Sequence, residues 1–164
     1  MDQLKDLFNN HNFTDEPNTH CLFLNPESHE TVNPPKDYKI RKIDKSFKNK
    51  FNELKKECSK DDLEEAQVSL DDDYIVGCFY NNKLISAASY WFWGEGLADI
   101  GVITHPEFRK NGLAKAIISY LTLKGIELNR INIYRHAADN KASKRLALAM
   151  NFQEKMIIET TKLI

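Results

Sequence analysis

The stretch 104–114 has the residue types of an anion-binding loop. Pro106 ends an apolar run, Arg109 and Lys110 follow it, and after Gly112 apolar residues recur at helical spacing. The N-terminus of a helix presents unpaired backbone N–H groups and the positive end of the helix dipole. Glycine lets a diphosphate approach this backbone, and the two cations attract it. The alternative is an ordinary turn that uses glycine only for its geometry.

Three other side chains could move a proton. Asp99 is the only acid in the apolar run 97–104, where its carboxylate could accept a proton from an ammonium group. The alternatives are an acid paired with a nearby Lys or Arg, or one that faces solvent. Tyr134 and His136 come at the end of a later apolar run, and Glu95, in a turn, is a second acidic candidate. No histidine has a paired spacing typical of metal ligands, so we expect no metal.

The composition is that of one globular domain. The chain has 164 residues, of which 41 % are apolar and 29 % are charged, and this length can bury a core. No apolar run approaches the roughly 20 residues of a membrane-spanning helix. The N-terminus has no apolar segment typical of a secretory signal, and the three cysteines form no CxxC pair. These features predict a cytoplasmic protein with reduced cysteines.

Charge is distributed unevenly along the chain. Residues 57–73 carry eight acidic and one basic side chain, whereas residues 109–164 carry four acidic and eleven basic ones. The formal net charge is only −1. A basic final third in a nearly neutral protein indicates a bound anionic ligand rather than a nucleic-acid surface. The alternative is that these lysines and arginines cover solvated helix faces.

Periodicity predicts the elements that position these residues. The predicted order from residue 74 is strand, strand, strand, helix, strand, helix, strand, at 74–80, 84–93, 97–104, 113–128, 131–135, 140–150 and 153–164. Asn81-Asn82 predicts a hairpin, because asparagine tolerates positive φ. A helix that connects two strands implies a partly parallel sheet, so the predicted class is α/β.

The segment before residue 74 gives weaker patterns. Helices are predicted over 2–10, 45–57 and 61–67, and strands over 21–24 and 38–43. In the run 84–93, alternation sends Tyr90 and Phe92 to one face and Trp91 and Trp93 to the other. One aromatic pair is expected in the core, and the other could line a pocket for a cationic amine. His105 is expected at the surface of the loop.

The pattern Arg-x-x-Gly-x-Ala at 109–114, between a strand and an apolar helix, resembles the pyrophosphate loop of the GNAT superfamily of acyl-CoA-dependent N-acyltransferases. Asn140, Ser143, Leu146 and Phe152 resemble a later motif of this superfamily, an Asn followed by a helix that ends in Gly-Phe. The resemblance covers about residues 74–160. It implies one domain over 1–164, a splayed mixed β-sheet flanked by helices with a central parallel strand pair. Residues 74–164 would form the acyl-CoA-binding core, and 1–73 the substrate-side part.

The resemblance also implies a site. Acetyl-CoA would enter the gap between the strands at 97–104 and 131–135, with its pantetheine arm along the strand backbone near Ile103, where an N–H would stabilise the oxyanion. The residues expected to bind it are Ile103, Thr104, Arg109, Lys110, Asn111, Gly112, Leu113, Ala114, Asn140 and Ser143. Asp99, Tyr134 and His136 are the expected catalytic residues. The expected partners are acetyl-CoA and an amine, without nucleic acid or membrane, for a monomer or homodimer.

Two positions depart from the family pattern. Asn151 replaces a glycine, which asparagine can do because it tolerates left-handed φ. Ala147 stands where a tyrosine often protonates the leaving thiolate, so Tyr134 becomes a candidate for that role. The predicted function is transfer of an acetyl group from acetyl-CoA to a primary amine of a small molecule by direct attack. The alternatives are acetylation of a protein N-terminus or lysine, and a CoA-binding sensor or interaction module without catalysis.

Overall fold

The computed structural model describes residues 13–163, and the helix predicted over 2–10 lies outside this range. A seven-stranded sheet has the order β2-β3-β4-β5-β6-β1-β7. Its strands are β1 (Phe13–Leu24), β2 (Tyr38–Lys42), β3 (Tyr74–Tyr80), β4 (Lys83–Trp93), β5 (Leu97–Thr104), β6 (Ile131–Ala137) and β7 (Phe152–Leu163). The helices are α2 (Lys48–Lys56), α3 (Lys60–Ala66), α4 (Leu113–Glu127) and α5 (Lys141–Leu148), with short 3₁₀ turns at 26–28, 45–47 and 106–108. The β5–β6 pair is parallel and the others are antiparallel, which confirms the predicted mixed α/β sheet.

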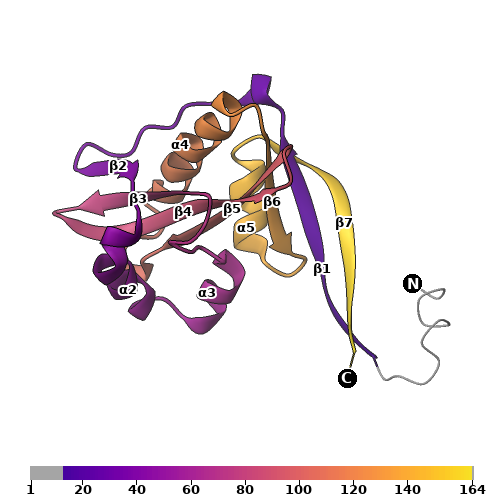
Figure 1. The fold of residues 1–164 in the computed structure, drawn as a ribbon. Coiled ribbons are helices and arrows are strands. Elements are labelled where there is room, and N and C mark those ends of the chain that lie inside the picture. Colours follow the sequence, from indigo (N-terminus) through magenta and orange to yellow (C-terminus); the bar gives the residue numbers. More distant parts are fainter. Residues whose placement is uncertain (1–12, 164) are drawn as a thin grey trace.

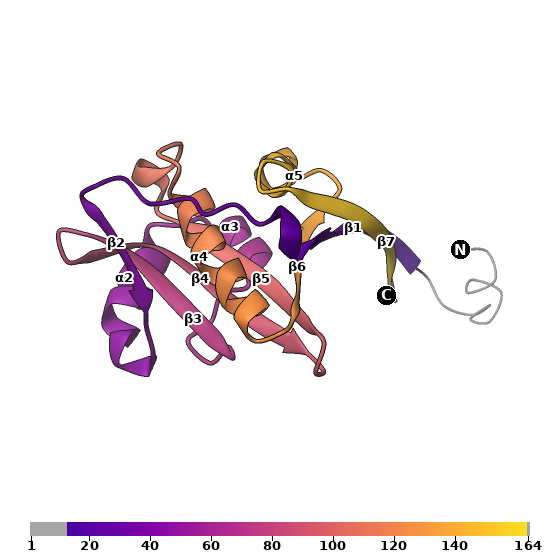
Figure 2. The same ribbon diagram turned by 90° about the horizontal axis from the view of Figure 1, so that it is seen from above.

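The helices cover both faces of the sheet. Figure 1 shows α2 and α3 on one face and α4 and α5 on the other. Each face has its own core. Phe51 and Leu54 of α2 pack with one cluster, and Ile117 and Leu121 of α4 belong to the other. Burial of these side chains, each worth about 1.5–3 kcal/mol, holds the helices to the sheet. Figure 2 shows β1 and β7 leaving this body as a two-stranded extension.

The structure contains the hairpin that Asn81-Asn82 predicted. Asn81 and Asn82 have φ values of 45° and 65° and form the turn between β3 and β4. Alternation along β4 is also as predicted, because Tyr90 is fully buried whereas Trp91 is 59 % exposed. Asn151 has a φ of 62°, the left-handed conformation for which glycine is otherwise preferred.

The parallel pair separates part-way along its length, as the sequence analysis expected. The β5–β6 ladder ends where Ile100 lies opposite Tyr134, while β5 continues to Thr104. Two hydrogen bonds show which way each β5 residue faces. Ile131 donates to the carbonyl of Gly96, on the β6 side, and the N–H of His105 donates to Ile85, on the β4 side. Backbone direction alternates along a strand. The backbone groups of residues 102 and 104 therefore face the gap, and the N–H of residue 103 points to β4.

The N-terminal part differs most from the prediction. The predicted strand at 21–24 is the end of the much longer β1, which lies between β6 and β7. Pairing of β1 with β7 shifts register between Glu16 and Thr19, and this irregular, polar segment lacks the alternation that identifies a strand. The predicted helix at 45–57 is a 3₁₀ turn followed by α2, because Asp44 accepts a hydrogen bond from the N–H of Ser46 and starts a tight turn there.

Candidate active site

A cavity of about 500 Å³ lies where β5 and β6 separate, between α3 on one face of the sheet and α5 on the other. We call the two parts of this cavity the loop end and the strand end. The loop end is lined by Thr104, Arg109, Ala114, Asn140 and Ser143. The strand end is lined by Asp72, Ser89, Trp91, Asp99 and Arg135.

The loop end contains the exposed N-terminus of α4. The first intrahelical bond runs from Ala116 N–H to the carbonyl of Gly112, and no side chain among the described residues caps this end. The backbone N–H groups of the first turn therefore have no intrahelical acceptor. Gly112 has a φ of 74°, and a Cβ added there would meet no described atom within 4 Å. This open, positively polarised backbone fits a diphosphate.

The predicted loop residues contribute in different ways. Ala114 lines the cavity, whereas the Leu113 side chain is 1 % exposed and packs in the core, so only its backbone can face a ligand. Lys110 and Asn111 are exposed beside the cavity rather than in its wall. The prediction that His105 lies at the surface of the loop is wrong, because this residue is buried, with 2 % of its surface exposed. Its ring accepts a hydrogen bond from the N–H of Glu107 and lies 3.0 Å from the Lys83 Nζ.

Arg109 is fixed at the loop end by two contacts. Its Nε donates to the Thr104 carbonyl at 3.1 Å, and its Nη2 lies 2.9 Å from Oδ2 of Asp62 on α3. Burial alone would raise the pKa of Asp62, but hydrogen bonds from Arg109 and Ser59 outweigh this and the pKa is lowered. The guanidinium therefore faces the loop end as part of an ion pair.

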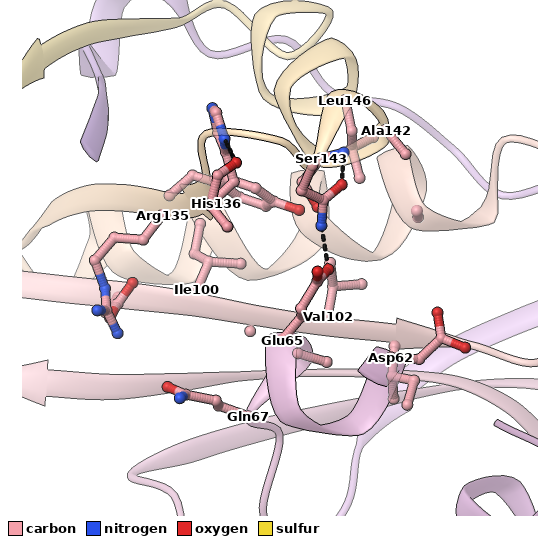
Figure 3. Close-up of a pocket in the computed structure, with 18 of the residues that line it drawn as sticks. Asp62, Glu65, Gln67, Ile100, Val102, Arg135, His136, Ala142, Ser143 and Leu146 are labelled. Carbon is pink, nitrogen blue, oxygen red and sulfur yellow. Dashed lines mark hydrogen bonds and ion pairs between the residues drawn. The ribbon is translucent and has the colours of Figure 1, made fainter. Parts of the chain in front are cut away.

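Asn140 is held in a similar way. Its Oδ1 accepts a hydrogen bond from the N–H of Ser143 at 2.9 Å, so Asn140 caps the start of α5. Its Nδ2 donates to the carboxylate of Glu65 on α3. Figure 3 marks both hydrogen bonds with dashed lines, one toward Ser143 and one toward Glu65. Asp62 and Glu65 lie one helical turn apart, so α3 contacts both sides of the loop end.

Asp99 both faces the cavity and is paired with an arginine, and it does not face solvent. It lines the cavity, is 5 % exposed, and accepts a hydrogen bond from the Nε of Arg135 at 2.6 Å. Burial raises the pKa of Asp99, and the charge of Arg135 opposes only part of this rise. A carboxylate whose pKa is raised binds a proton more readily, which is the property a general base needs.

Asp72 is a residue of the strand end that sequence reasoning missed. Its Oδ2 accepts hydrogen bonds from the Ser69 N–H at 2.8 Å and from the Ser89 hydroxyl at 2.5 Å. Burial raises the pKa of Asp72 despite these bonds. The available signal was the acidic segment 57–73, which also supplies Asp62 and Glu65. A run of acids usually marks a solvated surface, so nothing in this segment alone places these three acids at a site.

Tyr134 and His136 both line the cavity, but their contacts differ. Tyr134 lines the cavity, is 4 % exposed and packs edge-on against Phe152, and burial raises the pKa of its hydroxyl. The ring of His136 stacks on His20 of β1 at 5.2 Å, and in Figure 3 it extends away from Glu65. Its Nδ1 lies 2.7 Å from the carbonyl of Ala137. The catalytic role of His136 stays a prediction.

Three further positions considered in the sequence, 147, 95 and 103, differ in their burial and in their distance from the cavity. Ala147 is fully buried in the core, so it leaves no polar group where the family often has a tyrosine. Glu95 is exposed in the turn between β4 and β5, outside the cavity wall. Ile103 lines the cavity with a buried side chain, and the backbone donors nearest to it that face the gap are those of Val102 and Thr104.

Two structural absences hold for the described part of the chain. Among residues 17–159, no group of three or more His, Cys, Asp or Glu side chains is arranged to hold a metal ion. Among the same residues, no helix has the length and apolar character needed to cross a membrane.

Comparisons with known proteins agree with this geometry. A GNAT-family protein from Novosphingobium aromaticivorans has 17 % identity and a TM-score of 0.71 over 92 % of this chain and 66 % of its own. A GNAT-family acetyltransferase from Colwellia psychrerythraea has 13 % identity and a TM-score of 0.69 over 99 % of this chain and 61 % of its own. A tandem GNAT protein from the clavulanic acid biosynthesis pathway has 14 % identity and a TM-score of 0.71 over 99 % of this chain and 57 % of its own.

These three likenesses concern the fold. The chain spans about two thirds or less of each of these structures. No curated protein matches the sequence. The family model for GNAT acetyltransferase, by contrast, matches residues 8–159, which is most of the chain. With a parallel strand pair that separates beside an uncapped helix N-terminus, and with this match over nearly its whole length, the chain belongs to the GNAT acetyltransferase family.

Proposed function

We propose that this protein transfers an acetyl group from acetyl-CoA to a primary amine of a small molecule. The observation that carries the proposal is a single cavity that joins two chemically different ends. The loop end offers helix N–H groups and Arg109 to an anion, and the strand end offers the buried carboxylate of Asp99 to a proton. Acetyl-CoA supplies the thioester, and the protein supplies the positions of its two substrates.

Binding of the donor would use the backbone first. The open N-terminus of α4 and the positive φ of Gly112 suit the diphosphate. The gap between β5 and β6 would take the pantetheine arm, where the backbone groups of residues 102 and 104 face it. Asn140 and Ser143, at the start of α5, line the same passage. The N–H groups of residues 102 and 104 would also stabilise negative charge on the thioester oxygen.

Proton transfer would divide between two buried residues. Asp99, held by Arg135, accepts a proton from the attacking amine directly or through one water. Tyr134 donates a proton to the departing thiolate, in place of the tyrosine that is absent at position 147. A tyrosine hydroxyl carries its proton at neutral pH, and burial raises the pKa of Tyr134 further, so this proton is present for transfer to the thiolate. Most of the acceleration would come from holding two substrates in one cavity.

A thiol-release assay tests this proposal. The protein is incubated with acetyl-CoA and, separately, with a panel of small primary amines and a lysine-containing peptide. Free thiol is measured, and the acetylated product is identified by mass. Release that depends on a small amine supports the proposal, whereas release only with the peptide supports protein acetylation. CoA binding without amine-dependent release from any acceptor would contradict an enzymatic role.

A further inference from the structure

We infer that the strand end selects an acceptor that carries a second cationic group, and that Asp72 is the residue that recognises this group. The substrate class is therefore a diamine, or an amine with an equivalent positive charge. This inference rests on the proposed function and concerns the acceptor part of the same site.

The two carboxylates of the strand end, Asp99 and Asp72, do not have the same counter-ions. Asp99 has the guanidinium of Arg135 at 2.6 Å, while the donors to Asp72 are neutral, the Ser69 N–H and the Ser89 hydroxyl. Among residues 17–159, whose side chains the structure describes, no basic group lies within ion-pair distance of Asp72. A partly buried carboxylate without a counter-ion is destabilised, and a bound cation would relieve this cost.

The two exposed tryptophans of β4 show the same contrast. The guanidinium of Arg135 lies 5.1 Å from the ring centre of Trp93. Trp91 lines the cavity, is 59 % exposed, and has no cation over its ring among the described residues. Arg135 thus serves one acid and one aromatic ring. No cation of residues 17–159 contacts the second acid, Asp72, or the second ring, Trp91, so this pair is suited to a cationic group of a ligand.

Strand register relates this pair to Asp99. Trp91 lies opposite Asp99, and Ser89, which binds Asp72, lies opposite Gly101. Residues two apart on a strand share a face and are separated by about 7 Å. A short diamine can therefore place one nitrogen near Asp99 while the other lies between Asp72 and Trp91. An acceptor with an uncharged tail would leave Asp72 without a counter-ion.

Three acceptors with the same four-carbon chain test the inference. They are 1,4-diaminobutane, butylamine and 4-aminobutanoate, whose tails are cationic, neutral and anionic. We expect kcat/KM with acetyl-CoA to be about tenfold higher for the diamine than for butylamine, the ratio given by about 1.4 kcal/mol, and lowest for 4-aminobutanoate. Asp72→Asn keeps the two hydrogen-bond acceptances but removes the charge. It should lower the ratio of kcat/KM for the diamine to kcat/KM for butylamine from about ten to about one.

Asp71→Asn is the matched control. Asp71 is the neighbouring acid, pairs with Lys45 at the surface and does not line the cavity, so the preference for the diamine should persist. Trp91→Leu changes an exposed position and gives a second test that does not depend on the folding of Asp72→Asn. It should lower the diamine value by about threefold. Equal kcat/KM for the diamine and butylamine in the unmodified protein would overturn the inference while leaving the proposed function intact.

A binding measurement separates this inference from the proposed function. The chain has two tryptophans, both on β4 beside the strand end, so their fluorescence reports on this region. Addition of 1,4-diaminobutane should change the fluorescence of the unmodified protein, with a much weaker response in Asp72→Asn. This result would support the site even if no amine were acetylated. An unmodified protein that gives no response to the diamine, and no preference for it, would overturn the inference.

Discussion

The loop end and the strand end are built from different parts of the chain's chemistry. The loop end relies on backbone: unpaired N–H groups at the start of α4, a positive φ at Gly112, and a strand edge that faces a gap. The strand end relies on side chains that three separate segments bring together, exemplified by Asp72, Trp91 and Arg135. A ligand bound by backbone can be recognised from a short local motif. A ligand bound by side chains from distant segments is specified by the fold, so its recognition varies with the residues on each strand.

The largest expected effect follows from filling the backbone site. Gly112→Asp places a carboxylate in the open space at the start of α4, where it blocks a diphosphate sterically and repels it. Like charges placed together cost several kcal/mol, so the affinity for CoA should fall about 100-fold or more. Isothermal calorimetry with CoA measures this loss.

Gly94→Asp is the matched control for this change. Gly94 also has a positive φ, 56°, and open space around it, but it lies in the turn between β4 and β5. Its substitution introduces the same backbone strain and the same charge away from the loop end. Undiminished CoA affinity in a folded Gly112→Asp protein would show that the loop end does not bind the diphosphate.

Asp99→Asn should have the next largest effect, and it acts at the strand end alone. Loss of a general base lowers kcat by about 10²–10⁴-fold, while CoA affinity should stay the same. The unmodified protein should lose activity as pH falls through the raised pKa of Asp99, because the carboxylate becomes protonated. Asp99→Asn should lack this step, and its deficit should shrink at high pH, where more of the amine is already neutral. A pH–rate profile measures both features.

Glu95→Gln is the comparison for this variant, because Glu95 is an exposed acid in the turn just before β5. It should retain the profile of the unmodified protein. Overlapping profiles for Asp99→Asn and the unmodified protein would remove Asp99 from the mechanism and leave His136 as the next residue to examine.

Tyr134→Phe tests whether the missing family tyrosine is replaced. It should lower kcat by about 100-fold and leave the KM for acetyl-CoA nearly unchanged, because the ring still packs against Phe152. Steady-state kinetics separates the two parameters. Tyr120→Phe, at a half-exposed position of α4, is the control and should have no effect. Unchanged kcat in Tyr134→Phe would mean that the thiolate leaves without this donor.

The smallest expected effect concerns the contact between α3 and the loop end. Glu65 holds the side-chain amide of Asn140 and adds negative charge beside a site for an anion. Glu65→Gln should therefore raise CoA affinity by about threefold, on the scale of a partly exposed charge interaction. Asp61→Asn removes the same charge from an exposed position of the same helix and should change affinity less. If calorimetry gives the same change in CoA affinity for both variants, the effect comes from the overall charge and not from the contact between Glu65 and Asn140.

The elements that carry the loop end could be predicted because each has a local signal. The strand at 97–104 has the predicted bounds, and α5 begins directly after Asn140, close to the predicted start of that helix. The position of α3 could not be predicted from its own residues. Its end packs against β5 only because residue 101 is glycine: a Cβ there would lie 2.3 Å from the carbonyl oxygen of Ala66. That close approach decides which acids of α3 reach the cavity, and it depends on two segments that share no sequence pattern.

The long strand β1 has a consequence for how the chain reaches this structure. Phe13 pairs with Leu163 and Leu24 pairs with Phe152, so the sheet is completed by partners from opposite ends of the described sequence. Pairings of such long sequence separation form late, because much chain entropy is lost before they contribute stability. During synthesis β1 has no strand to pair with until β6 has been made, and its second edge stays unpaired until β7 has been made. Folding of the side of the sheet that holds Tyr134 and Arg135 is thus tied to the last strand to emerge, and the two-stranded extension is the part of the sheet most exposed to mispairing along the way.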